Sequence, residues 1–155
     1  MEKPTKTAKQ MLDLKKQTGF IAIGPNSSVL DALKVLADRN IGAVLITEGD
    51  RLIGILSERD YARKGELQNR TANSTPVREI MTTDVVSVSP NQTVEECRKI
   101  MGDKRIRHLP VISAGRVIGV LSSKDILDEI IAEDEKVIKE LAFEQMRLTT
   151  DTGTY

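Results

Sequence analysis

The segment Gly54–Asp60 reads GILSERD, and Gly119–Asp125 repeats it as GVLSSKD. In both copies an aliphatic run ends at a serine, and an aspartate follows three positions later. This pattern is typical of a strand that leads directly into a helix, because serine is a preferred N-cap and an acid in the first turn complements the helix dipole. The recurrence of the junction indicates that the chain contains one structural unit twice.

The repeat extends well beyond these seven residues. Residues 20–62 align with residues 85–127 without a gap, and 12 of the 43 aligned positions are identical. Many of the other positions exchange one aliphatic residue for another. Because so long a period with only two copies is not that of a solenoid, we expect a duplicated subdomain.

Each copy is predicted to form a β-α-β-β-α unit. A short strand ends at Pro25 or Pro90, and a helix follows with Ser28 or Thr93 as its N-cap. Thr93-x-x-Glu96 also matches a capping box. Two aliphatic runs joined by a glycine turn then predict a hairpin, and a second helix starts after each repeated serine.

A unit this small buries too little surface to be comfortably stable alone, so the two copies are expected to pack together. The predicted fold class is α/β (α+β), with two βαββα units related by pseudo-two-fold symmetry, an N-terminal docking helix and a C-terminal helical extension. Two equivalent clefts would lie at the junction. The predicted boundaries are 1–18 for the N-terminal helix or arm, 19–64 for the first copy, 65–76 for the linker, 77–130 for the second copy, and 131–155 for the C-terminal helix and frayed tail.

The two ends of the chain are predicted to be helical. The N-terminal helix begins at a capping box, Thr7-x-x-Gln10. The C-terminal helix is expected to run from Asp125 to about Leu148, and residues 149–155 are expected to fray. Its acidic segment 128–136 is either a solvated helix face or a partner surface. Its apolar stripe comprises Leu127, Ile131, Ile138, Leu141 and Leu148.

The composition argues against a nucleic-acid-binding or a membrane protein. Lysine plus arginine equals aspartate plus glutamate at 23 each, whereas a nucleic-acid partner requires concentrated positive charge. No apolar run approaches the roughly 18 residues of a membrane span, and the N-terminus lacks the apolar core of a signal peptide. The single cysteine, Cys97, cannot form an intramolecular disulfide, which favours the cytoplasm.

The Ser-x-x-Asp junctions allow a structural and a binding interpretation. Structurally, Ser57 and Ser122 cap the helix that follows, which is worth about 1 kcal/mol each. Alternatively, a helix N-terminus is a ready phosphate site, and a carboxylate can accept two hydrogen bonds from a ribose diol. Both copies keep a basic residue, Arg59 or Lys124, directly before the aspartate, which favours a nucleoside phosphate as the ligand.

The two copies resemble a pair of cystathionine β-synthase (CBS) motifs over residues 5–128. The resemblance lies in SPNQTVEEC, KRIRHLPVISAGRVIGVLSSKDIL, NIGAVLITEGDRLIGILSERDYARK and PVREIMTTDVVSV. It implies a regulatory module without catalytic residues, metal or required cofactor, which binds AMP, ADP, ATP, NAD or S-adenosylmethionine in its clefts. It also implies a homodimer shaped as a flat disk and an unidentified regulated protein partner.

The resemblance also assigns the site residues. The repeated aspartates would hold ribose, the repeated serines would face phosphate, and residues 83–86 would line adenine. Arg107 and His108 stand where relatives carry basic phosphate ligands, whereas their counterparts in the first copy are Gly42 and Ala43, so the two sites are expected to differ. The ligand-binding set is Ser57, Arg59, Asp60, Thr83, Asp84, Val85, Val86, Arg107, His108, Pro110, Ser122, Lys124 and Asp125, with Arg63 and Lys64 as a second candidate anion site.

Three functions stay open on the sequence alone. The favoured one is a nucleotide sensor; a dimerisation scaffold with vestigial clefts and a small nucleotide-dependent enzyme are the alternatives. The enzyme is disfavoured because we find no nucleophile–base pair and no metal-ligand cluster in the sequence. His108 either contacts phosphate or lies on the surface beside Arg107, and Cys97 is expected to be a buried small hydrophobe.

Overall fold

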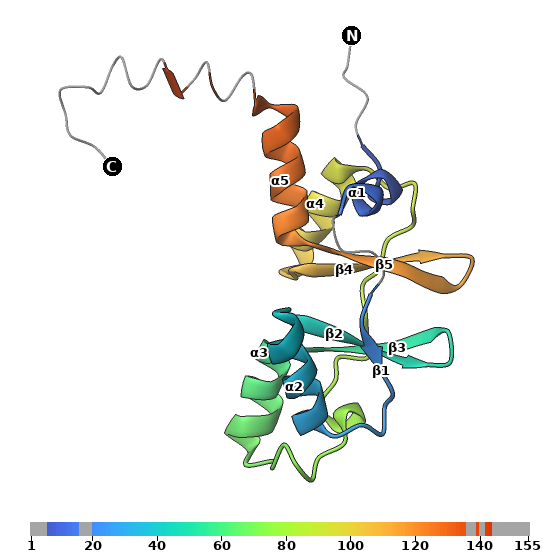
Figure 1. Cartoon of the computed structure of the whole chain (residues 1–155), viewed down its shortest axis with the longest axis vertical. Coiled ribbons are helices and arrows are strands. Elements are labelled where there is room, and N and C mark those ends of the chain that lie inside the picture. The colour runs from blue at the N-terminus through green and yellow to red at the C-terminus, as the bar shows by residue number, and fades with distance from the viewer. Residues whose placement is uncertain (1–5, 16–19, 136–138, 140–141, 144–155) are drawn as a thin grey trace, which may run out of the picture.

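The computed structural model describes residues 6–15, 20–135, 139 and 142–143. Figure 1 shows two similar halves, one above the other along the long axis, each with a small β-sheet flanked by helices. This arrangement confirms the predicted α/β class and the duplicated unit. Within the described ranges, no helix has both the length and the apolar character that a membrane span requires.

The first half contains a three-stranded sheet. In it β1 pairs with β2 in parallel and β2 pairs with β3 in antiparallel register. The helix after Ser57 changes form: it is regular only at its start and continues as a π-helical segment, Tyr61–Gly65, and a 3₁₀ turn, Glu66–Gln68. The elements are β1 (Ala22–Ile23), α2 (Val29–Arg39), β2 (Ala43–Glu48), β3 (Arg51–Ser57) and α3 (Glu58–Asp60).

The second half contains the antiparallel hairpin of β4 and β5. The strand predicted before Pro90 is wrong in extent, since only Val88 forms a bridge, parallel to Val111. The hairpin turns through Ala114 and Gly115 with φ of 50° and 78°, a left-handed pair typical of two-residue hairpin loops. The elements are α4 (Val94–Lys104), β4 (His108–Ser113), β5 (Arg116–Ser122) and α5 (Ser123–Glu133).

The N-caps predicted for the helices after Pro25 and Pro90 are found at α2 and α4. The hydroxyl of Ser28 accepts a hydrogen bond from the Asp31 N–H (3.0 Å), and that of Thr93 accepts one from the Glu96 N–H (3.2 Å). The capping box predicted at Thr93 is wrong, however, because its reciprocal half does not form: the Glu96 carboxylate accepts a bond from the Gln92 side chain instead. Each serine or threonine nevertheless fixes where its helix begins.

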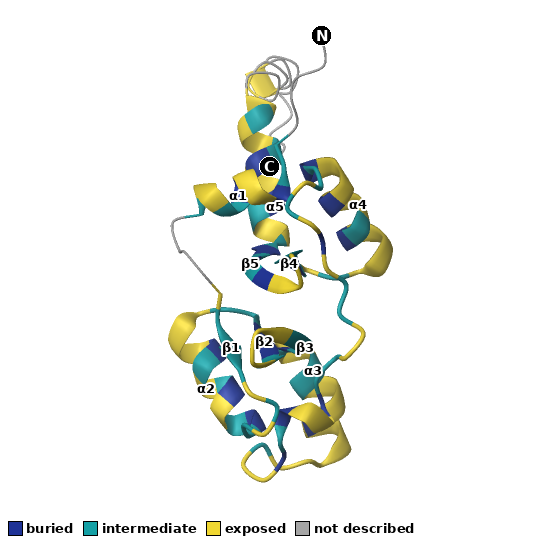
Figure 2. Ribbon diagram, turned by 90° about the vertical axis from the view of Figure 1, so that its right-hand side faces the viewer, coloured by how far each residue is buried: buried dark blue, intermediate teal, exposed yellow. Residues whose placement is uncertain are grey.

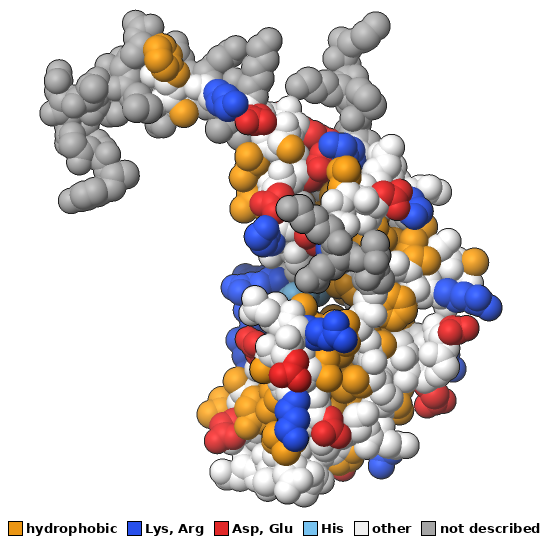
Figure 3. All heavy atoms as spheres, in the orientation of Figure 1, with side chains coloured by type: hydrophobic (Ala, Val, Ile, Leu, Met, Phe, Trp, Pro, Cys, Tyr) orange, Lys and Arg blue, Asp and Glu red, His pale blue; other side chains and the backbone are white. Residues whose placement is uncertain are grey.

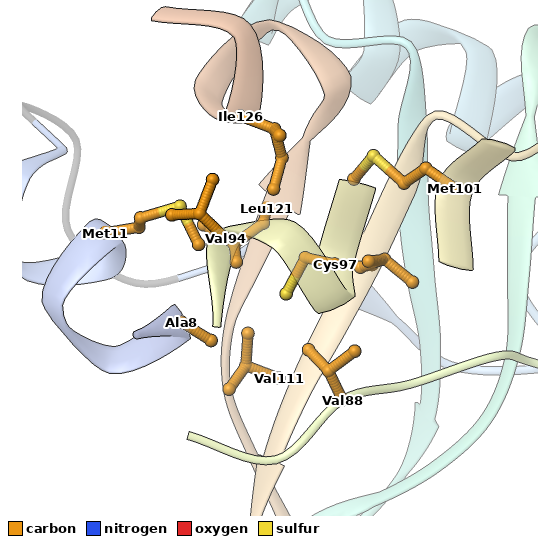
Figure 4. Packing of buried hydrophobic residues seen from close by; sticks show 10 residues of the cluster. Ala8, Met11, Val88, Val94, Cys97, Met101, Val111, Leu121 and Ile126 are labelled. Atoms are coloured by element: carbon orange, nitrogen blue, oxygen red, sulfur yellow. The ribbon is translucent and has the colours of Figure 1, made fainter. Parts of the chain in front are cut away.

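Each half has its own aliphatic core, and Figure 4 shows that of the second half. Cys97 is fully buried in it, and burial raises the pKa of its thiol to about 11, so the expectation of a buried small hydrophobe is confirmed. Figure 2 shows the same pattern across the molecule, with buried residues on the inner helix faces and exposed residues on the outer ones. The second core comprises Ala8, Met11, Val88, Val94, Cys97, Met101, Leu109, Val111, Leu121 and Ile126.

Helix α1 (Ala8–Leu14) belongs to the second half, although it precedes the first half in sequence (Figure 1). The predicted capping box at Thr7 is confirmed, and the Ala8 N–H donates to the Gln92 carbonyl (2.7 Å). In the first half, the Val77 N–H donates in the same way to the Ser27 carbonyl (2.8 Å). The segment after the linker therefore completes the first core, as α1 completes the second.

These two completing segments form an internal repeat that the sequence analysis missed. Residues 7–12 read TAKQML and residues 76–81 read PVREIM. Met11 is buried in the second core, and Ile80 in the first. The correspondence extends the pseudo-two-fold symmetry to almost the whole described chain.

Helix α5 leaves part of the predicted C-terminal stripe exposed. The side chains of Leu127 and Ile131 are 56% and 44% exposed, respectively. Ile138, Leu141 and Leu148, as well as residues 149–155, lie outside the described residues.

Candidate functional site

A cavity of about 380 Å³ opens at the junction of the two halves, beside the first Ser-x-x-Asp motif. The first half contributes the end of β3 and the start of α3, and the second half contributes the segment before β4 together with residues 84–86. Figure 3 shows lysine and arginine side chains gathered on the surface near this junction. The lining residues are Gly42, Ala43, Ile55, Ser57, Glu58, Arg59, Asp60, Thr82, Asp84, Val85, Val86, Arg105, Ile106, Arg107 and His108.

The carboxylate of Asp60 is held in place by its own helix turn. Its Oδ2 accepts hydrogen bonds from the Ser57 N–H (2.9 Å) and hydroxyl (3.1 Å), and its Oδ1 accepts one from the Thr82 hydroxyl (3.0 Å). The Ser57 Oγ in turn accepts from the Asp60 N–H (3.1 Å). The structural interpretation of this motif is therefore correct, and the carboxylate also lines the cavity.

The second motif has the same cap but a different surrounding. The Asp125 carboxylate accepts a bond from the Ser122 N–H (2.8 Å), and the Lys15 ammonium at the end of α1 lies 2.8 Å from the same Oδ2. Lys15 also donates to the Val120 carbonyl (2.8 Å). Lys124 pairs with Asp128 (2.7 Å). In this open hollow of about 750 Å³, the carboxylate already holds a cation from the chain itself.

Lys15 is a residue of the second cleft that sequence reasoning missed. The repeat of residues 7–12 in residues 76–81 gives the signal that could have found it. Continuing that alignment places Lys15 opposite Asp84, which lines the first cleft. The two clefts thus differ by a cation for an acid at one equivalent position.

Burial and neighbouring charges shift the pKa values of two site residues. Burial lowers the pKa of His108 below its ordinary value of 6.5, and the positive charges of Lys15 and Arg107 lower it further. Burial of Asp125 acts to raise its pKa, but the hydrogen bonds from Lys15 and Ser122 outweigh it, so the pKa lies below 3.8. His108 lines the first cavity, and the charges of Lys15 and Asp125 in the second cleft also shift its pKa. The surface alternative for His108 is wrong, since its side chain is half-buried.

These pKa shifts predict that the free energy of unfolding decreases as the pH is lowered. Around pH 6.5 the unfolded chain binds a proton at His108 that the folded chain takes up only at lower pH, so the free energy of unfolding decreases as the pH falls through that window. Asp125 adds a further loss below about pH 4. Urea denaturation between pH 5 and 8 measures the first effect. Since His108 is the single histidine, His108→Gln should flatten the profile; an equally steep profile in that variant would contradict the assignment.

Some of the other residues predicted at the site do not line the first cavity. Thr83 does not line the cavity, whereas its neighbour Thr82 does. Pro110 is buried in β4 opposite Val120 and lies outside the cavity lining. Arg63 and Lys64 are exposed and do not line it either, and the Lys64 ammonium lies 3.5 Å from the Asp60 carboxylate. The structure thus brings Arg59, Arg107 and His108 to the first cavity but not the second candidate anion pair.

Comparisons with known proteins agree with this architecture. The sequence model of the CBS domain matches residues 13–66 and 77–132. The mitochondrial CBS domain-containing protein CBSX3 of Arabidopsis thaliana is 36% identical over 121 residues, which cover 75% of this chain and 59% of that protein. This chain therefore matches little more than half of that relative's length.

Two solved structures are similar over more than four fifths of this chain. A signal-transduction protein with CBS domains from Burkholderia ambifaria is 42% identical, with a TM-score of 0.79 over 82% of this chain and 95% of that one. The CBS domain pair of protein MJ0100 is 28% identical, with a TM-score of 0.74 over 84% of this chain and 99% of that one. The MJ0100 structure is a complex with 5-methylthioadenosine and S-adenosyl-L-methionine.

Proposed function

This chain belongs to the CBS domain family, and from that premise we propose that it is a non-catalytic regulatory module that binds an adenosine-containing nucleotide in the first cleft. AMP, ADP, ATP and NAD are the ligands proposed. The observation that carries the proposal is the cavity at the first junction. It joins the Asp60 carboxylate of one half to Arg107 and His108 of the other.

The cavity has the size and chemistry of a nucleotide site. Its volume of about 380 Å³ falls in the range of small-molecule pockets. Asp60 offers acceptors for ribose hydroxyls, Arg107 offers a guanidinium for phosphate, and Val85, Val86 and Ile106 supply aliphatic surface for a base. The complex of the related MJ0100 domain pair with two adenosine compounds supports adenosine as the shared group.

The first cleft is proposed over the second because of Lys15. A ribose diol that approached Asp125 would compete with the Lys15 ammonium, which lies 2.8 Å from its Oδ2. In the first cleft, the Asp60 carboxylate accepts bonds from Ser57 and Thr82, and its nearest cation, the Lys64 ammonium, is 3.5 Å away. A ribose at Asp60 would therefore displace no closely held cation.

A ligand in this cavity would act as a regulator by bridging the halves. It would contact α3 of the first half and the start of β4 of the second. It would therefore favour the arrangement of the two halves in which both elements can contact the ligand at once. Coupling energies of this kind are typically about 1–3 kcal/mol. The readout is proposed to be the packing of a homodimer or the binding of a regulated protein partner in the cytoplasm.

A dimerisation scaffold is the second candidate function. The observation that favours it is that both Ser-x-x-Asp motifs cap their own helices completely. In that case the clefts would be vestigial, and nucleotides would leave the stability of the protein unchanged.

A thermal-shift experiment distinguishes the two candidates. AMP, ADP, ATP or NAD at 100 times its dissociation constant is expected to stabilise the protein by about 2.7 kcal/mol, or roughly 5–11 °C in Tm. Adenine alone, which lacks ribose and phosphate, serves as the control. No shift with any of the four nucleotides would favour the scaffold, whereas turnover of a nucleotide detected by chromatography would make the protein an enzyme.

A further inference from the structure

Arg105 reaches the first cavity from an unusual backbone position. It ends α4 with φ of 55°, in the left-handed region. The equivalent residue at the end of α2 is Asn40, with φ of 53°. Asparagine adopts this conformation readily and arginine does not. The second half therefore keeps a poorly suited residue at its helix end, and that residue lines the ligand cavity.

The cavity holds more guanidinium groups than one phosphate requires. Arg59, Arg105 and Arg107 all line it, and within the described part of the chain none of the three forms an ion pair. A guanidinium can donate two parallel hydrogen bonds to a phosphate, so a terminal monophosphate is satisfied by two of them. The third arginine is then available to bind a second phosphate.

Charges of both signs line the cavity. Glu58, Arg59 and Asp60 lie on the first turn of α3, and Asp84 belongs to the second half. Arg105 and Arg107 lie close together in the segment between α4 and β4. Carboxylates suit the hydroxyl donors of a nucleoside, and two neighbouring guanidiniums suit a phosphate chain.

We propose that the first cleft selects ligands that carry two or more linked phosphates, such as a nucleoside diphosphate, a nucleoside triphosphate or a dinucleotide, and that Arg105 contacts the phosphate beyond the first. This inference rests on the proposed function and narrows its ligand class. Arg107 and His108 hold the phosphate next to the nucleoside, and Arg105 discriminates according to whether a second one follows.

The substitution Arg105→Asn tests this because it installs the residue that the first half uses at the same backbone position. Isothermal titration with AMP, ADP and ATP, in buffer free of divalent cations, measures the three affinities. We expect the affinities for ADP and ATP to fall about 10-fold or more, and the affinity for AMP to change less than twofold. The Tm of the ligand-free variant should be unchanged or higher, because asparagine relieves the left-handed strain.

Lys104→Gln is the matched control, since it removes one positive charge from the same helix end at an exposed residue outside the cavity lining. It should leave all three affinities within twofold. Equal losses of AMP and ATP affinity in Arg105→Asn, or wild-type protein that binds AMP as tightly as ATP, would overturn the inference while leaving the proposed function intact. Failure of the wild-type protein to bind any of the three nucleotides would overturn both.

Discussion

Replacing Asp60 with alanine is expected to weaken AMP binding by roughly 10- to 150-fold, which corresponds to about 1.5–3 kcal/mol. Asp60 lines the first cavity and is the proposed acceptor for a ribose diol, so alanine would leave those hydroxyls without a charged partner. Titration calorimetry on the folded variant measures the change. Affinity within twofold of the wild-type value would remove Asp60 from the site.

Asp125→Ala is the matched control that the internal repeat provides. Each aspartate completes a capping box with its own serine, so both variants should lose a similar stability, about 1 kcal/mol. The sequence alone predicts the same loss of affinity for Asp125→Ala, but the ion pair with Lys15 changes that expectation. The affinity for AMP should now fall only in Asp60→Ala. Equal losses in both variants would contradict the preference for the first cleft.

The duplicated unit could be predicted because the repeat is 43 residues long and its strand-to-helix junctions carry identical residues. The serine, aspartate and glycine of GILSERD recur at one offset, and the hydrophobic periods of helix and strand agree with them. The completing repeat of residues 7–12 in 76–81 could not be recognised in the same way. None of its six positions is identical, and most are conservative exchanges, such as Met11 for Ile80; such short matches arise often by chance.

The composition of the cavity depends on packing between the halves. Arg105 is separated from Asp60 by 45 positions and ends a helix, where a basic residue is usual because it complements the helix dipole. Nothing in that local pattern places it across a cleft from α3. The regular helix after Ser57 spans only Glu58–Asp60 before it becomes π-helical, a change of form that the sequence pattern does not indicate. We propose that the side-chain cations before β4 supply most of the positive charge of the first cleft.

Met11→Ala is expected to cost about 2–5 kcal/mol of the free energy of unfolding, which is typical for removing a large buried side chain. Met11 is 3% exposed and packs in the second core with Val94 and Ile126 (Figure 4). If α1 were only a docked arm, its contacts would be dispensable and the loss would be small. Urea denaturation measures the difference.

Leu14→Ala is the control on the same helix, because Leu14 is 60% exposed, and its loss should stay within about 0.5 kcal/mol. Ile80→Ala should match Met11→Ala, since Ile80 completes the first core in the equivalent place. A cost below about 0.5 kcal/mol for Met11→Ala would contradict the integral role of α1. A large cost links the second core to the second cleft, because the helix that Met11 anchors also carries Lys15 to Asp125.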